Sequence, residues 1–177
     1  MPPNINMIGA NPQAGSQQII LKDATKRFNL RDFSYEEEQQ AIRAIHEAAY
    51  ILDRRLPDNL DPLLRKYYDA KYSDTIYAFG VLAENRKYVE RCQGWSVQLA
   101  LQLAKKVLVY DTKTKQWFQG DRFEARLPSN NNVERFTEVN RFVLCQAPDK
   151  LDKNATLVLP SSVGISTQQL LEQLLSC

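Results

Sequence analysis

The chain has 177 residues, of which 44% are hydrophobic and 25% are charged, and its formal net charge at pH 7 is +2. This composition is typical of a globular protein large enough to bury a core, and it argues against disorder and against a strongly polyanionic partner. The three cysteines lie far apart without a C-x-x-C pair, and one histidine is too few for an ordinary zinc site. We therefore expect reduced thiols, no metal ion and no cofactor.

Targeting and membrane segments are not recognisable. No stretch approaches the ~20 apolar residues that a membrane helix needs. Residues 1–16 lack the charged start and apolar run of a signal peptide. We expect a cytoplasmic protein without a membrane partner. Nucleic acid is not an expected partner either, because no long basic run accompanies the small net charge.

The N-terminal part is expected to begin with a strand and continue with a helix. Residues 4–9 form a short apolar run, and residues 10–16 form a polar loop with turn residues. Ser34 is a good N-cap, and Glu37 stands three residues later as its capping-box partner. The helix that follows is expected to end by Pro57, since proline cannot continue a helix.

A second helix is expected to start at Asp61 and Pro62, with Asp61 as the capping residue and proline in the first turn. Its apolar positions give one buried or half-buried stripe.

The middle of the chain predicts a βαβ unit. Residues 75–79 form a compact run of strand-favouring residues that ends at Gly80. A polar loop leads to an amphipathic helix over residues 94–105, and residues 107–110 form a second apolar strand. This order and spacing predict parallel strands. Since such apolar strands are usually buried on both sides, we expect helices on both faces of the sheet.

The last third is less regular. Residues 116–118 are expected to run back as a short antiparallel strand, and residues 123–127 are a candidate for another. Residues 133–145 fit a helix or a strand. Residues 156–159 resemble a buried strand, and Ser166 is expected to cap a leucine-rich final helix.

Together these elements predict an α/β fold with a Rossmann-like, open, mainly parallel sheet, helices on both faces and a small antiparallel hairpin. We expect a single domain over residues 1–177. It comprises an N-terminal strand and loop (1–16), a core (34–111), and a hairpin with a C-terminal strand and helix (112–177).

Ligands of open parallel sheets bind beyond the carboxyl ends of the strands. Three loops there contain glycine, after Ile8, Phe79 and Leu159, and the second leads into a helix whose free N–H groups suit phosphate. Arg91 adds a positive charge beside Gly94, although this glycine can also simply permit a tight turn. Neither a Walker loop nor G-x-G-x-x-G is present. The candidate ligand-binding residues are Gly9, Ala10, Asn11, Gly15, Ser16, Gly80, Arg91, Cys92, Gln93, Gly94, Trp95, Ser96 and Gln98.

Four segments resemble the SLOG superfamily, especially its uncharacterised bacterial and phage members. They are DTIYAFG (74–80), RCQGWSVQLA (91–100), KVLVYD (106–111) and QWF (116–118). That superfamily is similar in fold to the lonely-guy phosphoribohydrolases, the DNA-processing proteins of transformation and the molybdenum-cofactor carriers. The resemblance covers residues 33–118, about half of the chain, and implies a nucleotide pocket after the first of these strands.

Two departures from the family pattern bear on chemistry. The family's glycine-rich loop matches residues 90–94, of which only Gly94 is glycine. The position matched by Gln98 is a glutamate in the lonely-guy enzymes, where the carboxylate acts on the ribosyl bond. An amide cannot serve as a general base, so Glu90 is the one nearby carboxylate that remains.

Three functions remain open. The first is binding of a nucleotide or nucleotide-derived signal. In a phage protein, such binding would sequester the signal in the cytoplasm of an infected cell and counter host defence. The second is an enzyme that cleaves an N-glycosidic or phosphoribosyl bond with Glu90. The third is a structural or interaction protein with a decayed pocket. We expect the first, without catalytic residues, because His46 and Cys92 lack evident catalytic partners.

We also expect a homodimer. The leucine-rich C-terminal helix is a candidate contact surface, although it can equally complete the core. Trp117 and Phe118 are expected to cover the sheet edge or a subunit contact.

Overall fold

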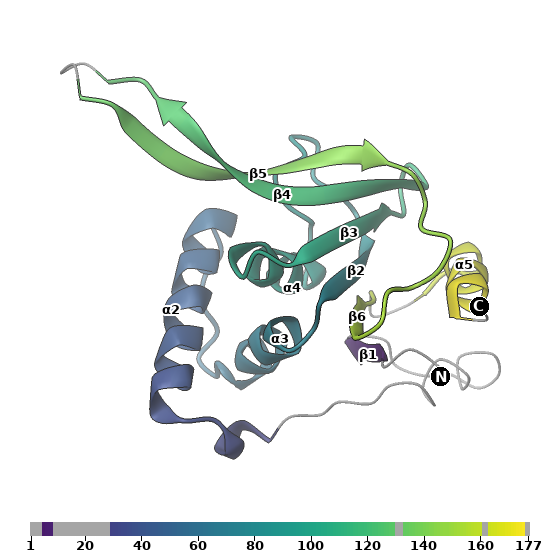
Figure 1. Cartoon of the computed structure of the whole chain (residues 1–177), viewed down its shortest axis with the longest axis horizontal. Helices are drawn as coiled ribbons and strands as arrows, with labels where there is room; N and C mark the ends of the chain where they lie inside the picture. Colours follow the sequence, from purple (N-terminus) through teal and green to yellow (C-terminus); the bar gives the residue numbers. More distant parts are fainter. Residues whose placement is uncertain (1–4, 9–28, 130–132, 161–162, 176–177) are drawn as a thin grey trace.

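The structure is a computed structural model that describes residues 5–8, 29–129, 133–160 and 163–175. Within these ranges the chain forms an α/β fold around a six-stranded mixed sheet (Figure 1). The elements in chain order are β1 (Ile5–Ile8), the short 3-10 helix η1 (Leu30–Asp32), α2 (Tyr35–Leu52), α3 (Asp61–Lys71), β2 (Thr75–Gly80), α4 (Gln93–Gln102), β3 (Lys106–Asp111), β4 (Gln116–Leu127), β5 (Arg135–Cys145), β6 (Ala155–Val158) and α5 (Ile165–Leu175).

The strand order is β1-β6-β2-β3-β4-β5, with four parallel strands followed by two antiparallel ones. β2 and β3 pair in parallel from Thr75 opposite Lys106 to Gly80 opposite Asp111, which confirms the predicted βαβ unit. β6 inserts between β1 and β2, so the first described strand, at the edge of the sheet, pairs with the last strand of the chain.

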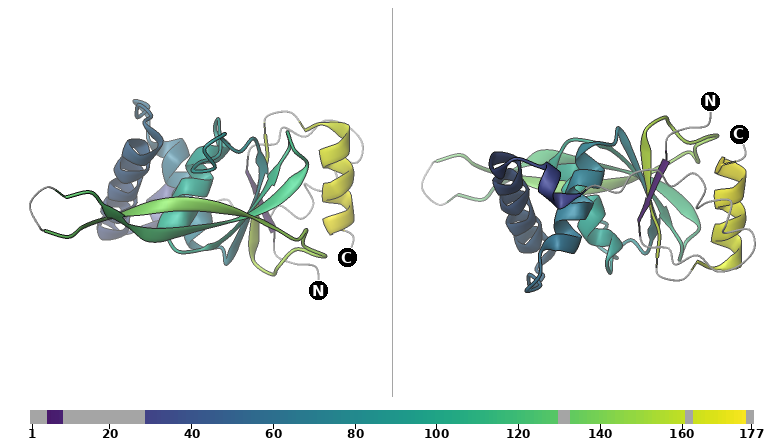
Figure 2. Two further views of the ribbon diagram at one scale, coloured as in Figure 1. Left: turned by 90° about the horizontal axis from the view of Figure 1, so that it is seen from above. Right: turned by 90° about the horizontal axis from the view of Figure 1, so that it is seen from below.

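Helices cover both faces of the sheet (Figure 2). α4 packs directly on one face through Val97 and Ala100, and α2 and α3 pack outside it. α5 covers the opposite face with Leu171 and Leu174. Every residue of β2 is buried, because alternate side chains enter the two core layers. None of the helices in the described ranges is long and apolar enough to cross a membrane.

Helix starts agree only in part with the predicted caps. The Ser34 hydroxyl accepts a hydrogen bond from the Glu37 amide at 3.2 Å, as expected of an N-cap. Asp61 is the first residue of α3 and caps nothing. Its own amide donates to the Asn59 side chain, and the flanking Leu60 is already helical. Similarly, α5 begins at Ile165, so Ser166 lies inside the helix rather than capping it.

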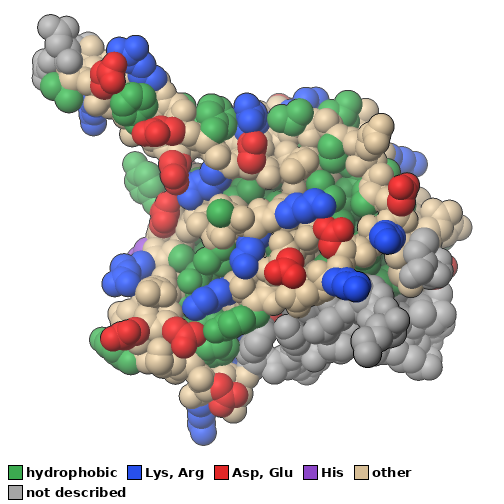
Figure 3. Space-filling view, viewed as in Figure 1, with side chains coloured by type: hydrophobic (Ala, Val, Ile, Leu, Met, Phe, Trp, Pro, Cys, Tyr) green, Lys and Arg blue, Asp and Glu red, His purple; other side chains and the backbone are tan. Residues whose placement is uncertain are grey.

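The predicted small hairpin is a long arm. β4 and β5 pair along their whole length, from Trp117 opposite Cys145 to Leu127 opposite Arg135. The arm extends past the layered body of the molecule (Figure 3). Trp117 and Phe118, at its base, are not surface covers: both are at least 95% buried and enter the cores on opposite faces of the sheet.

Candidate ligand-binding site

The carboxyl ends of β2 and β6 lie side by side, because the two strands are parallel neighbours. The chain leaves β2 towards α4 on one face of the sheet and leaves β6 towards α5 on the other (Figure 1). Neighbouring strands whose connections part in this way form a topological switch point, where α/β proteins bind ligands. This point, between Gly80 and Leu159, is the candidate site.

Gln93, the first residue of α4, spans the switch point. Its side-chain nitrogen donates to the carbonyl oxygen of Leu159 at 3.3 Å, and the side chain is 94% buried. Gly80 lies beneath it: a Cβ built at this glycine would be 3.2 Å from Val89 and 3.6 Å from the Gln93 side chain. The predicted residues Gly80 and Gln93 are therefore brought together.

Ser96 lies one helical turn after Gln93, on the same face of α4. It is 98% buried, and its hydroxyl has no hydrogen-bond partner among the described residues. A buried hydroxyl without a partner costs about 1–3 kcal/mol, so such groups are rare in proteins and call for an explanation. Among the described residues, Ser96 is the one predicted site residue with a buried side-chain polar atom that lacks a partner.

Gly94 is required by packing. A Cβ at this position would overlap the carbonyl oxygen of Val89 and lie 2.8 Å from Arg54 Nη2. The Arg54 guanidinium donates to the carbonyl oxygens of Arg91 at 2.5 Å and Val89 at 3.2 Å, and it also lies 5.8 Å from the centre of the Trp95 ring. The half-buried Trp95 thus packs against Arg54. Through these contacts Arg54, which follows the end of α2, holds the first turn of α4 in place.

The amides of this turn are only partly free. The Gly94 amide donates to the Arg91 carbonyl at 3.1 Å, and the Trp95 amide donates to the Cys92 carbonyl at 3.2 Å. A ligand therefore has fewer bare N–H groups available here than a glycine-rich loop offers.

Positive charge gathers around the loop. Lys66 of α3 donates from Nζ to the Cys92 carbonyl at 3.2 Å. Burial lowers the pKa of Lys66, and the nearby Arg54 acts in the same direction, whereas Cys92 and Asp69 raise it. Arg91 is exposed and has a left-handed backbone (φ 61°). Within the described part of the chain, Arg54, Lys66 and Arg91 form no ion pair.

Gln98 does not face the switch point. Its side chain is 99% buried and bonded on both sides, donating to Gln102 at 3.0 Å and accepting from Asn140 of β5. The position that matches the family's catalytic glutamate therefore holds α4 against the arm. Glu90 is exposed, so the one proposed substitute carboxylate lies at the surface.

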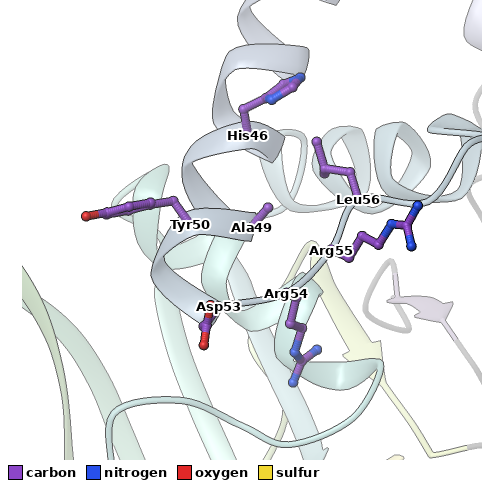
Figure 4. A pocket seen from close by; sticks show the side chains of 7 residues that line it. All are labelled: His46, Ala49, Tyr50, Asp53, Arg54, Arg55 and Leu56. Atoms are coloured by element: carbon purple, nitrogen blue, oxygen red, sulfur yellow. The ribbon is translucent and has the colours of Figure 1, made fainter.

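Arg54 and Lys66 were not among the predicted site residues. The signal for them was present, since both lie in basic segments (54–57 and 65–68) upstream of β2, but sequence alone does not show that they reach the same loop. Arg54 also lines an open depression of about 650 Å³ at the end of α2, together with His46, Tyr50 and Arg55 (Figure 4). The Tyr50 side chain there is 88% exposed.

Five predicted residues, Gly9, Ala10, Asn11, Gly15 and Ser16, lie outside the described residues, although the strand before them, β1, ends at the same edge of the sheet. Among the described residues, no group of three or more His, Cys, Asp or Glu side chains is placed to hold a metal ion. Comparison of the chain with protein-family models, with curated proteins and with solved structures finds no match.

Proposed function

We propose that this chain is a Rossmann-like, SLOG-type domain that binds a nucleotide or a nucleotide-derived signal at the switch point between β2 and β6. The observation that carries the proposal is the buried, partnerless hydroxyl of Ser96, one helical turn after Gln93, whose side-chain amide reaches the Leu159 carbonyl. Two polar groups on one helix face, above the ends of two parallel strands, supply the few oriented contacts that small-molecule sites need.

The charge around the loop supports an anionic ligand. Arg54 and Lys66 donate to backbone carbonyls, so they fix the loop and add positive potential to it. Arg91 is exposed and has its guanidinium available. A guanidinium matches a phosphate group in charge and geometry.

Binding without turnover fits the groups present. Gln98 is a structural amide, and a hydrolase that cleaves a ribosyl bond would have to rely on the exposed Glu90. Sequestration of a signal, such as one used in host defence against phage, needs only affinity.

Isothermal titration calorimetry against mono-, di- and cyclic nucleotides and nicotinamide derivatives tests the proposal. We expect saturable binding of at least one compound. Lack of binding across the panel at millimolar concentration would overturn the proposal. Chromatography of the same mixtures tests the enzyme alternative, because a released base that disappears with Glu90→Gln would identify a glycosidase.

Two variants localise the site. Ser96→Ala is expected to weaken binding about tenfold while leaving the fold intact, because a hydrogen bond to charged ligand groups is lost. Arg91→Gln is expected to weaken binding by a similar factor. Arg86→Gln is the matched control: Arg86 lies in the same β2–α4 loop, is also exposed and also has a left-handed backbone (φ 55°). Equal losses for both arginine variants would point to a nonspecific charge effect.

Self-association through the arm is a second candidate function. Six of the ten exposed large hydrophobic residues in the described structure lie on β4, on β5 or beside their turn: Phe123, Leu127, Val133, Phe136, Val143 and Leu144. The arm's charges are largely neutralised within it, through pairs such as Arg141–Asp121 and Arg126–Glu134. We propose that the homodimer forms here, because a second copy offers an equally apolar and neutral surface.

The C-terminal helix is a poorer candidate for this contact, since Leu171 and Leu174 are buried in the core. Sedimentation velocity tests the arm: Phe123→Glu and Val143→Glu, which lie on the same face of the arm, should yield monomers. Tyr35→Glu, at a residue that is 75% exposed on α2, is the control and should leave the dimer unchanged. A monomeric wild-type chain at 100 µM (roughly the upper end of useful concentrations) would contradict this candidate.

A further inference from the structure

A second pocket lies beyond the ends of β2 and β3, on the opposite side of β2 from β6. Its volume is about 230 Å³, and it lies between loop 82–86 and turn 111–114, with Phe118 in its wall. The volume is smaller than that of typical pockets for drug-sized ligands, about 300–1,000 Å³, and too small for a nucleotide. The pocket does not include any residue of the switch-point site.

Two cations and two carboxylates line this pocket: Arg86 and Lys113 against Asp111 and Glu84. Within the described residues, none of these four side chains forms an ion pair with another. Cations and carboxylates that line one pocket without pairing with each other can both pair with the charged groups of a bound ligand.

Asp111 and Arg86 are held in place by their neighbours. Asp111 is 96% buried, and its carboxylate accepts from the amides of Leu82 at 3.4 Å and Lys113 at 3.2 Å and from the Thr114 hydroxyl at 2.9 Å. An ionised carboxylate has about four acceptor positions, so one remains. The Arg86 guanidinium lies 5.1 Å from the centre of the Phe118 ring, a cation–π contact that holds it at the pocket wall.

We propose that this pocket binds a small zwitterion, an α-amino acid with an apolar side chain. The amino acid's carboxylate pairs with Arg86 and Lys113, its ammonium group donates to Asp111 and Glu84, and its side chain contacts Phe118 and Leu82. The pocket's charges sum to zero, which suits a neutral zwitterion better than a multiply charged phosphate. This inference is independent of the proposed nucleotide site.

Titration of the full chain with L-leucine, followed in amide NMR spectra, tests the proposal. We expect saturable shifts at the amides of Leu82, Lys113 and Thr114, with millimolar affinity. N-acetyl-leucine lacks the ammonium group and leucinamide lacks the carboxylate. Each should bind at least about tenfold more weakly than L-leucine, since each leaves charged groups of the pocket unpaired. Equal binding of all three compounds would overturn the proposal that the pocket recognises a zwitterion. Absence of shifts with L-leucine would overturn the proposal that the pocket binds an amino acid.

Variants separate the two sites. Lys113→Gln and Arg86→Gln should each weaken leucine binding about tenfold by removing a partner of the carboxylate. Lys115→Gln is the control: Lys115 is an exposed cation in the same turn but does not line the pocket. Arg91→Gln should leave leucine binding unchanged. Loss of leucine binding in Lys115→Gln or Arg91→Gln would contradict the assignment to this pocket.

Discussion

The side-chain amide of Asn140 on β5 donates to the side-chain oxygen of Gln98 on α4, and the same amide group also donates to the Lys87 carbonyl at 2.9 Å. One buried residue of the arm thereby fixes the helix and the loop that precedes it. Because α4 also carries Gln93 and Ser96, this contact sets the orientation of the candidate ligand site.

Gln98→Glu tests that contact. A carboxylate would be 99% buried with only amides beside it, so we expect the free energy of unfolding to fall by about 3 kcal/mol or more. Urea denaturation at pH 7 measures the change. Gln119→Glu, an exposed substitution on β4, is the control and should change stability by less than about 0.5 kcal/mol. A well-tolerated Gln98→Glu would contradict the described burial of this side chain.

Gly94→Ala tests the packing of the first turn of α4. The added methyl group would overlap the Val89 carbonyl and displace the Arg54 guanidinium, so we expect a loss of about 1–3 kcal/mol. Gly164→Ala is the matched control, because nothing lies within 4 Å of a Cβ at that position. If thermal denaturation shows equal effects at both positions, the first turn is looser than described.

Ser96→Ala should stabilise the free protein. Removal of a buried hydroxyl without a partner is expected to raise the free energy of unfolding by about 1 kcal/mol. Ser73 is a contrasting buried serine: its hydroxyl is 2.6 Å from both the Asp69 carbonyl and the Thr156 hydroxyl, so Ser73→Ala should cost about 1 kcal/mol. Chemical denaturation measures both changes, and the free energy of unfolding should rise in Ser96→Ala and fall in Ser73→Ala.

The pH dependence of stability should include a contribution from Asp152. A hydrogen bond from Lys106 at 2.9 Å, aided by one from Thr75, holds the pKa of this carboxyl below its ordinary value of 3.8. The ionised group therefore stabilises the fold above the unfolded pKa, and this stabilisation is lost as the pH falls through the folded pKa.

Because the side chain is 41% exposed, we expect Asp152→Asn to cost less than about 1 kcal/mol at pH 7. The difference from wild type should be constant between pH 5 and 7 (roughly one unit and more above the unfolded pKa) and shrink as the pH falls through the folded pKa. Denaturation across this range measures it. A difference that grows on acidification would contradict the assigned sign.

Local patterns predicted much of the fold. The apolar runs of β2 and β3, the helical spacing of α4 and the Ser34 cap are short-range signals, and each element formed where expected. Residues 133–145 were ambiguous because their pattern suits a helix or a strand, and pairing with β4 makes residues 135–145 a strand. Asp61 was misassigned as a cap because Leu60 before it is already helical.

The candidate site was only partly readable from sequence. Gly80, Gln93 and Ser96 were found because they flank a strand end and a helix start. The hydrogen bonds of Arg54 to residues 89 and 91 span α3 and β2 in the sequence, and no periodicity reports such a contact. The role of Gln98 was hidden for the same reason, since Asn140 lies on a strand that sequence left undecided.

The position of β6 constrains the order in which the chain assembles. β1 pairs with β6 alone among the described strands, and β6 follows almost the whole chain. During synthesis the ribosome must therefore release nearly every residue before β1 finds its neighbour, whereas the arm closes from adjacent segments as soon as it emerges. β1 and β6 are expected to be the last part of the sheet to form, and a nascent chain stalled before Ala155 would leave the edge of β2 open to other chains.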